Sequence, residues 1–355
     1  MLSYLVTRPT QGMLQAMESA EVGDDVYGED PSVNALEKQM AQMMGKESAI
    51  FCASATMCNL LGITSLLARP PRNLSHSDGF TGPPYSVVCN HRSHIYLWEA
   101  GNLAVFGQAT TIPIHPRHGI HLDHEDVARH AWAPGDAHVA PTRVISLENT
   151  LDGTIMPLES IRRIHRQAQD HGQWIHLDGA RLWNASVATH TPMYQYGQYA
   201  DTITLCLSKG IGAPVGAVLV GPRGIIDQAR HYRKLLGGGW RQAGGLAAAA
   251  AHALSDYTER MIRDHEHARI LGEEAVKHGW SLTLPIDTNM VWLDGRMILQ
   301  RRGWSSKALE DYFLHRWGIR VGGMDAQGNM RCVLHHQVTP EDVDLMIKAL
   351  KGLVK

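Results

Sequence analysis

Short apolar segments alternate with amphipathic segments over most of the chain, and this alternation predicts a layered α/β fold. Nearly continuous apolar runs predict strands at 49–52, 86–89, 143–147, 174–177, 202–207 and 217–220. Apolar residues at helical spacing predict helices between them, at 56–67, 158–171 and 224–236. Strands without polar alternation are buried on both faces, so we expect a mostly parallel sheet sandwiched by helices.

The pattern changes after about residue 253, where a second, smaller unit is predicted. Its strands are expected at 290–293 and 330–334, and its helices at 306–317 and 340–350. The sequence Thr339-Pro340-Glu341-Asp342 is a typical helix start, with a capping hydroxyl, an early proline and acids near the positive helix end. We therefore expect an N-terminal arm bordering the substrate site over 1–30, a large domain over 31–253 and a small α+β domain over 254–355.

The composition narrows the function to a cytoplasmic enzyme for small molecules. Lys+Arg total 33 against 35 for Asp+Glu, and this balance favours neither nucleic acid nor an anionic membrane as partner. The five cysteines are odd in number and scattered, which is typical of reduced thiols. We see no signal peptide and no apolar run of the ~18 residues that a membrane span needs. The 21 histidines include three i,i+3 pairs, but these lie in turn-rich sequence without acidic or cysteine clusters, so we expect no metal site.

Lys209 stands just after an apolar run, in the segment "CLSKGIGAPVG". A lone lysine at a strand end is usually an ordinary surface residue, but desolvation lowers the pKa of a buried one and suits it to Schiff-base chemistry. Asp178 ends the preceding predicted strand, and parallel sheets bind ligands at the carboxyl ends of their strands. A carboxylate there can hold a pyridine nitrogen protonated, or it can simply cap the next helix.

Three further segments point to the same cofactor. The segment "CASATMCN" (52–59) predicts a strand, a turn and a helix start with Ser54 and Thr56, where backbone N–H groups favour a phosphate. The segment "RKLLGGGWRQ" (233–242) flanks three glycines with cations, which suits an anion or a flexible connection. His94 follows a predicted strand and could stack on a flat ring. Together these features indicate pyridoxal phosphate bound to Lys209.

The chain resembles the threonine aldolases, which are fold-type I pyridoxal-phosphate enzymes of the β-eliminating lyase group. The resemblance runs from about Val6 to the C-terminus, and the sequence is most similar to that of fungal members. It rests on the motifs "VGDDVYGEDPSVNALE", "LWEAGN", "ISLENTLDGTIMPLE", "HLDGARLWNA", "CLSKGIGAPVGAVLVG" and "KLLGGGWRQAGGLAAAA".

This resemblance implies a role for each matching position. Lys209 matches the Schiff-base lysine, Asp178 the partner of the ring nitrogen, and His94 the histidine on the ring face. The implied phosphate ligands are Ala55 (where the family usually has glycine), Thr56, Ser208 and, from a neighbouring subunit, Lys234 and Arg241. Arg181 lies where the family contacts both cofactor and substrate, and the implied substrate-site residues include Ser3, Tyr27, Arg181 and Arg331. A homodimer or homotetramer with shared active sites is therefore expected.

Two departures from the family pattern keep the reaction open. Tyr4 and Leu5 replace an acid and a threonine of the N-terminal segment, and Leu151 replaces a histidine found in many bacterial members.

The resemblance implies cleavage of L-threonine or L-allo-threonine to glycine and acetaldehyde, with His94 as the expected base through water. The alternative is an alanine racemase on the same fold, as in fungal peptide pathways, with Lys209 serving one face and Tyr4, His94 or water the other. A binding protein without activity is a third possibility, which the intact lysine, aspartate and arginines oppose.

Overall fold

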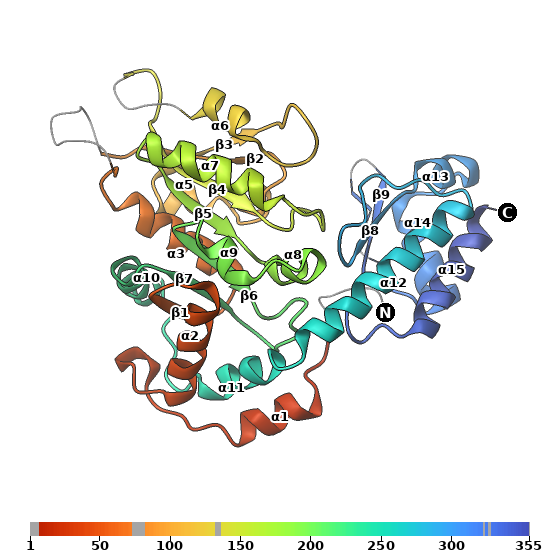
Figure 1. Ribbon diagram of the computed structural model, residues 1–355. Coiled ribbons are helices and arrows are strands. Elements are labelled where there is room, and N and C mark those ends of the chain that lie inside the picture. The colour runs from red at the N-terminus through yellow and green to blue at the C-terminus, as the bar shows by residue number, and fades with distance from the viewer. Residues whose placement is uncertain (1–6, 73–81, 132–135, 322–323, 326–327, 355) are drawn as a thin grey trace.

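Two units of unequal size are joined by one long helix, α12 (Tyr257–Lys277), in the computed structural model of the protein (Figure 1). The structure describes residues 7–72, 82–131, 136–321, 324–325 and 328–354. The larger unit is built on a seven-stranded sheet and the smaller one on a two-stranded sheet. Among the described helices, none combines the length and the apolarity that crossing a membrane requires.

The large sheet has the order β3-β2-β4-β5-β6-β7-β1 and is mostly parallel. Strand β7 runs antiparallel to both of its neighbours, whereas the pairs from β3 to β6 are parallel. The predicted mostly parallel sheet is thus confirmed. The strands are β1 (Ser48–Cys52), β2 (Tyr85–Asn90), β3 (Ala109–Ile114), β4 (Thr142–Glu148), β5 (Trp174–Asp178), β6 (Thr202–Cys206) and β7 (Ala217–Gly221).

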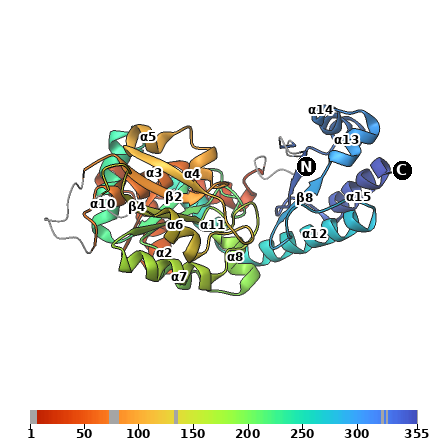
Figure 2. The ribbon, with the colours of Figure 1, turned by 90° about the horizontal axis from the view of Figure 1, so that it is seen from above.

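Helices cover both faces of this sheet, as its apolar strands require (Figures 1 and 2). One face packs against α3 (Ala55–Leu67), α4 (His94–Leu97), α5 (Asn102–Phe106) and α10 (Arg223–Leu235). The other face carries the main core, with α2 (Pro31–Met44), α6 (His124–His130), α7 (Leu158–Asp170), α8 (Leu182–Thr189) and α9 (Met193–Gly197). Helices α1 (Gln11–Glu18) and α11 (Gly244–Ala253) pack beside α2 on that face, and a short 3-10 turn (Asp25–Tyr27) precedes α2.

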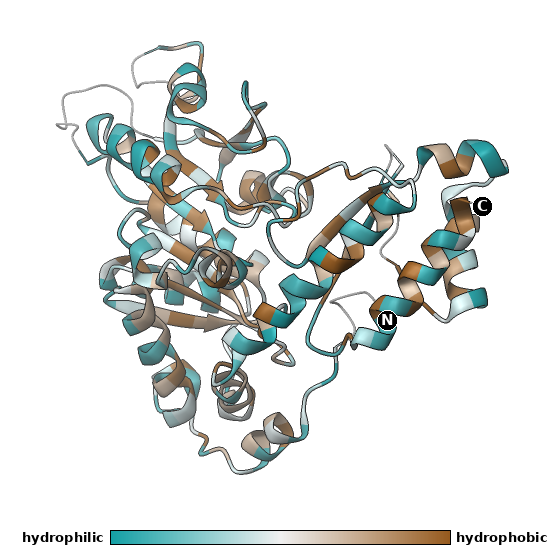
Figure 3. Cartoon of the chain, turned by 45° about the vertical axis from the view of Figure 1, so that its right-hand side comes forward, coloured by the Kyte–Doolittle hydropathy of each residue, from teal (hydrophilic) through white to brown (hydrophobic). Residues whose placement is uncertain are grey.

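The small unit has its own apolar core, formed by its sheet, its helices and the second half of α12. In α12, Met261 belongs to the core of the large unit, while Ala268, Leu271 and Ala275 belong to that of the small one. Figure 3 shows apolar residues on the strands inside and hydrophilic residues on the outer helices. The remaining elements are β8 (Met290–Asp294), β9 (Asn329–Val333), α13 (Arg296–Arg302), α14 (Ser306–Asp311), a π-helical turn (Tyr312–Arg316) and α15 (Pro340–Val354).

A buried acid on α12 makes stability depend on pH. Burial raises the pKa of the Asp264 carboxyl to about 7, against the opposing charges of Arg260 and Arg263. The side chain is almost fully buried, and its Oδ2 has no hydrogen-bond partner among the described residues. The folded state therefore binds a proton that the unfolded state releases, and this stabilisation is lost as the pH rises through the folded pKa.

We expect Asp264→Asn to remove this pH dependence. Between about pH 5 and about pH 8 the free energy of unfolding of the wild type should fall by roughly 1–3 kcal/mol relative to that of the variant. Urea denaturation at both pH values measures the difference. Asp227→Asn, an equal change at an exposed position on α10, serves as the control. Parallel pH profiles for the wild type and Asp264→Asn would contradict this account.

Candidate active site

Acidic and basic residues gather where the parallel strands of the large sheet end. Strand β4 ends at Glu148 and β5 at Asp178, and these two residues are register partners. Strand β6 pairs with β5 and ends at Cys206, and Lys209 lies in the bend that follows. The sequence therefore brings Asp178 and Lys209 to the same edge of the sheet, the edge at which α/β proteins bind ligands.

The charges of Asp178 and Lys209 both affect the pKa of the nearby Glu148 carboxyl. Burial raises the pKa of its carboxyl well above the usual range, and the charge of Asp178 raises it further, while the charge of Lys209 opposes the shift. Glu148 Oε2 accepts a hydrogen bond of 2.8 Å from the backbone N–H of His94. This edge of the sheet thus holds a carboxyl with a raised pKa beside a lysine and an aspartate.

His94 is the first residue of α4, and its ring reaches the same place. Its Nδ1 lies 2.8 Å from Oε1 of the buried Glu99. One side-chain N or O atom each of His94, Glu99 and Asp178 lies within 4.8 Å of the others. The histidine predicted to cover a cofactor ring and the aspartate predicted to face its nitrogen therefore lie close together.

These same three residues form the one group of potential metal ligands found in the described part of the chain. Asn59 already donates hydrogen bonds to both acids, 2.8 Å to Glu99 Oε1 and 2.8 Å to Asp178 Oδ2. The group is thus held together by hydrogen bonds among its members and Asn59. The histidine pairs weighed from the sequence do not contribute further members to it.

The predicted phosphate turn is formed by the start of α3. Ser54 is its N-cap and accepts a hydrogen bond from the backbone N–H of Met57, so that Ala55 and Thr56 occupy the first turn. Ser208 follows β6, with its Oγ 3.3 Å from Sγ of Cys206. A helix start of this length presents free N–H groups and a positive dipole end, which suit a phosphate.

The two arginines expected near a substrate carboxylate come from different units. Arg181 is the N-cap residue of α8, directly after the Asp178 strand. Arg331 lies on β9, and its guanidinium lies over the ring of Trp292 at 5.8 Å. The Trp292 indole N–H donates a 2.9 Å hydrogen bond to the backbone carbonyl of Asp152, which follows β4. This contact holds the small sheet against the loop next to Glu148.

Lys234, Arg241 and Tyr27 form a separate, exposed group on the surface of the large unit. Lys234 lies in the last turn of α10, and Tyr27 is 74% exposed. Arg241 pairs with Asp24 at 2.6 Å, and this hydrogen bond together with Tyr27 raises the pKa of the guanidinium. Their predicted role requires a second subunit and stays a prediction. Ser3 and Tyr4 lie outside the described residues.

Sequence reasoning missed four residues of this region: the half-buried Glu148 and the buried Glu99, Asn59 and His176. Glu148 could have been found, because it directly follows a predicted strand in the same way as Asp178. The other three carry no comparable sequence pattern, since their place in the site depends on contacts between distant segments.

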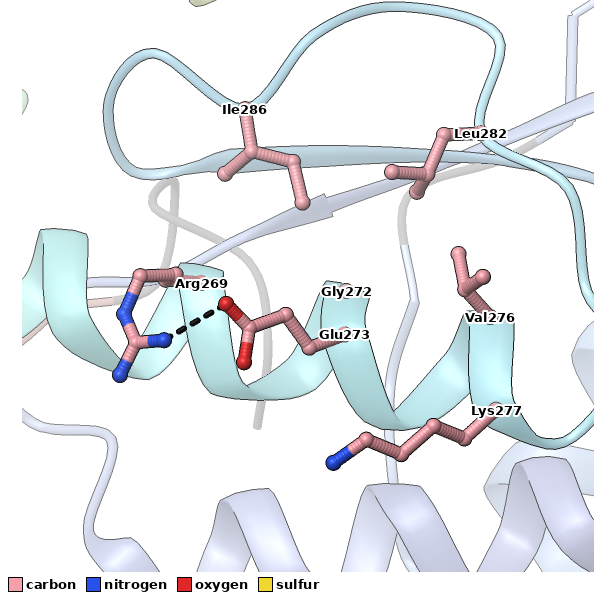
Figure 4. A pocket seen from close by; sticks show the side chains of 7 residues that line it. All are labelled: Arg269, Gly272, Glu273, Val276, Lys277, Leu282 and Ile286. Atoms are coloured by element: carbon pink, nitrogen blue, oxygen red, sulfur yellow. Dashed lines mark hydrogen bonds and ion pairs between the residues drawn. The ribbon is translucent and has the colours of Figure 1, made fainter.

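A pocket of about 480 Å³ lies on the small unit and is open to solvent. Figure 4 shows its lining on α12 and on the segment that carries Leu282 and Ile286, with Arg269 and Glu273 paired at 2.6 Å. None of the predicted site residues lines it. It is a shallow, mainly apolar groove on the opposite unit from Lys209.

The fold is shared with solved enzymes of known type. A threonine aldolase of Leishmania major superposes with a TM-score of 0.78 over 99% of this chain and 98% of that chain, at 18% identity. A serine palmitoyltransferase solved with pyridoxal phosphate gives a TM-score of 0.69 over 96% of this chain and 82% of that chain, at 17% identity. At these identities the likeness establishes the fold, which is the predicted fold-type I.

Sequence similarity extends the relationship further. A low-specificity L-threonine aldolase of Candida albicans is 39% identical over 347 residues, which cover 97% of this chain and 87% of that protein. The model of the beta-eliminating lyase family matches residues 1–296. With this match and the identity above, the chain belongs to the beta-eliminating lyase family.

Proposed function

We propose that the protein is a pyridoxal-phosphate-dependent aldolase that cleaves L-threonine or L-allo-threonine to glycine and acetaldehyde. The observation that carries the proposal is the shared edge of β4, β5 and β6, where Glu148 interacts with the charges of both Asp178 and Lys209. The similarity to a low-specificity L-threonine aldolase supports the choice of substrate.

The residues at this edge fit pyridoxal phosphate. The amine of Lys209 suits the aldehyde, Asp178 the ring nitrogen and His94 the ring face. The first turn of α3 with Ala55 and Thr56, together with Ser208, suits the phosphate. When bound, the cofactor accepts the electron pair of the bond that breaks at the substrate Cα.

The protein's own groups would supply the remaining steps. Arg181 and Arg331 bind the substrate carboxylate and orient the Cα–Cβ bond. His94, acting through water, takes the proton of the β-hydroxyl, the Cα–Cβ bond breaks, and a proton returns to Cα. Burial and the charge of Asp178 raise the pKa of Glu148, and this shift disfavours a second negative charge beside Asp178.

A racemase remains the second candidate because of one observation. Leu151, which stands where many bacterial members of the family have a histidine, is buried and lines a small cavity with His121 and Glu148. An apolar wall suits an alanine methyl group better than a hydroxyethyl group. The relative and the solved aldolase reported above offer no specific support for racemisation.

An exposed apolar surface supports the proposed homodimer or homotetramer. Trp98 is 72% exposed, Val105 69% and Phe106 54%, all on or beside α4 and α5. Large apolar side chains exposed on neighbouring short helices are typical of a surface that a second subunit covers. In such an assembly the exposed Lys234 and Arg241 would reach the phosphate of a neighbouring subunit.

All five cysteines are buried and free, which supports a reducing, cytoplasmic location.

The purified protein with pyridoxal phosphate should release acetaldehyde from L-threonine or L-allo-threonine. A coupled alcohol dehydrogenase assay measures this release, and D-threonine serves as the control substrate. Exchange of the alanine α-proton in deuterated water and formation of D-alanine are measured in parallel. Formation of D-alanine without acetaldehyde from either threonine isomer would replace the aldolase by the racemase.

A further inference from the structure

The buried amide of Asn59 joins both acids of the site. Asn59 lies on α3, one turn after Thr56, and is fully buried. Its Nδ2 donates to Glu99 Oε1 at 2.8 Å and to Asp178 Oδ2 at 2.8 Å. The reverse orientation would place the amide oxygen against two carboxylates, so these neighbours fix the orientation of the amide. Both of its hydrogens are thus committed to the acids.

The oxygen of the same amide determines the tautomer of a buried histidine. Asn59 Oδ1 lies 3.0 Å from Nε2 of His176, which must therefore carry the hydrogen. Burial lowers the pKa of His176 to about 4, although the charge of Asp178 opposes the shift, so the ring is neutral near pH 7. Its Nδ1 is then an acceptor, and the Thr202 hydroxyl at 2.9 Å donates to it.

The hydrogen bonds accordingly run in one direction, from Thr202 through His176 and Asn59 to the two carboxylates. Each donor in such a chain polarises the next and strengthens it. Packing keeps the chain dry: at Gly62, one turn beyond Asn59, a Cβ would meet the His176 ring at 3.0 Å. The helix can approach the histidine this closely because that position has no side chain.

Asp178 is itself one of the two residues that would contact the cofactor ring, and Glu99 holds the other, His94. Asp178 also accepts a 3.0 Å hydrogen bond from the backbone N–H of Ala180, which leaves its carboxylate oriented from two sides. Glu99 binds His94 Nδ1 through the same oxygen that accepts from Asn59, at 2.8 Å. Two buried carboxylates this close repel each other, and the amide between them offsets that repulsion.

We propose that Asn59 is a positioning residue that fixes Asp178 where it would face the ring nitrogen and, through Glu99, fixes His94 where it would cover the ring. The inference rests on the proposed function. Because Thr56 and Asn59 lie one turn apart on α3, the same residue also fixes the spacing between the phosphate turn and the partner of the ring nitrogen. His176 and Thr202 act through Asn59 by holding its amide in the donating orientation.

The test uses substitutions that keep shape but change hydrogen-bond donors. Asn59→Asp removes both donors and brings a third acid to the cluster, so the dissociation constant for pyridoxal phosphate, measured by titrating the apoprotein, should rise at least about tenfold. His176→Leu should weaken binding, and His176→Gln, which can still donate to Asn59, should restore most of it. Asn289→Asp is the matched control: its buried amide donates to the backbone carbonyl of Leu334 in the small unit.

Nitrogen NMR of the histidine-labelled apoprotein gives an independent readout, because it needs no cofactor. We expect a neutral His176 with its hydrogen on Nε2. The inference is overturned by a charged His176, by an Nδ1–H tautomer, or by a folded Asn59→Asp protein that binds the cofactor within about twofold of the wild type. A wild type that shows the expected tautomer but has no affinity for pyridoxal phosphate would instead overturn the proposed function.

Discussion

Replacing Lys209 by alanine should abolish turnover, with kcat falling by at least about 1,000-fold. The lysine lies in the bend after β6, at the sheet edge that also holds Asp178 and Glu148. Without its amine the cofactor has no covalent anchor, and the visible absorbance band of the lysine-bound cofactor should be missing. Acetaldehyde release and the absorbance spectrum measure the two effects.

Lys277→Ala is a suitable control, because this exposed lysine on α12 pairs only with the surface acid Glu274 among the described residues. It should leave both the rate and the spectrum of the wild type unchanged. A Lys209→Ala protein that retains the absorbance band and the rate would refute the assignment of the lysine.

Asp178→Asn should lower kcat by roughly 100-fold or more. The substitution keeps the shape of the side chain but removes the negative charge that would hold the ring nitrogen protonated. The loss should appear in kcat more than in KM, because the charge stabilises the electrons released when the Cα–Cβ bond breaks. Steady-state kinetics of acetaldehyde release separate the two parameters.

Asp201→Asn provides a matched control for this change. Asp201 accepts a hydrogen bond from the backbone N–H of Ile175, near the start of β5, and pairs with Arg72. It therefore lies at the opposite edge of the same sheet from Asp178. A loss of kcat no larger for Asp178→Asn than for Asp201→Asn would mean that the charge of Asp178 has no role in the reaction.

The sequence predicted the strands that are buried on both faces, because each of them is a continuous apolar run. Strand β3 was missed, since it lies at the edge of the sheet and is only partly buried. Its polar threonines and Pro113 do not form an apolar run, and an edge strand tolerates the proline. Helix α12 was missed as well, because its surface is rich in charges and its short buried stripe serves two different cores. For that reason a domain boundary near residue 253 stays a prediction.

A site residue was predictable from the sequence where it comes directly after a predicted apolar strand. Lys209, Asp178 and the start of α3 follow from that rule, and their roles came from the family motifs. Asn59 and His176 were not predictable in this way, because each occupies a core position whose meaning depends on a partner from a distant segment. Lys234 and Arg241 are exposed on the surface of a single chain, and because their predicted role needs a second subunit, it stays a prediction.

Reduction of the holoenzyme with borohydride, followed by digestion and peptide mass spectrometry, tests the central claim most directly. If the amine of Lys209 carries the cofactor, the reduced pyridoxyl group should be found on the peptide that contains Lys209, and Lys209→Ala should leave that peptide unlabelled. Cofactor attached to a different lysine, or a cofactor-bound enzyme that no reduction labels, would contradict the account.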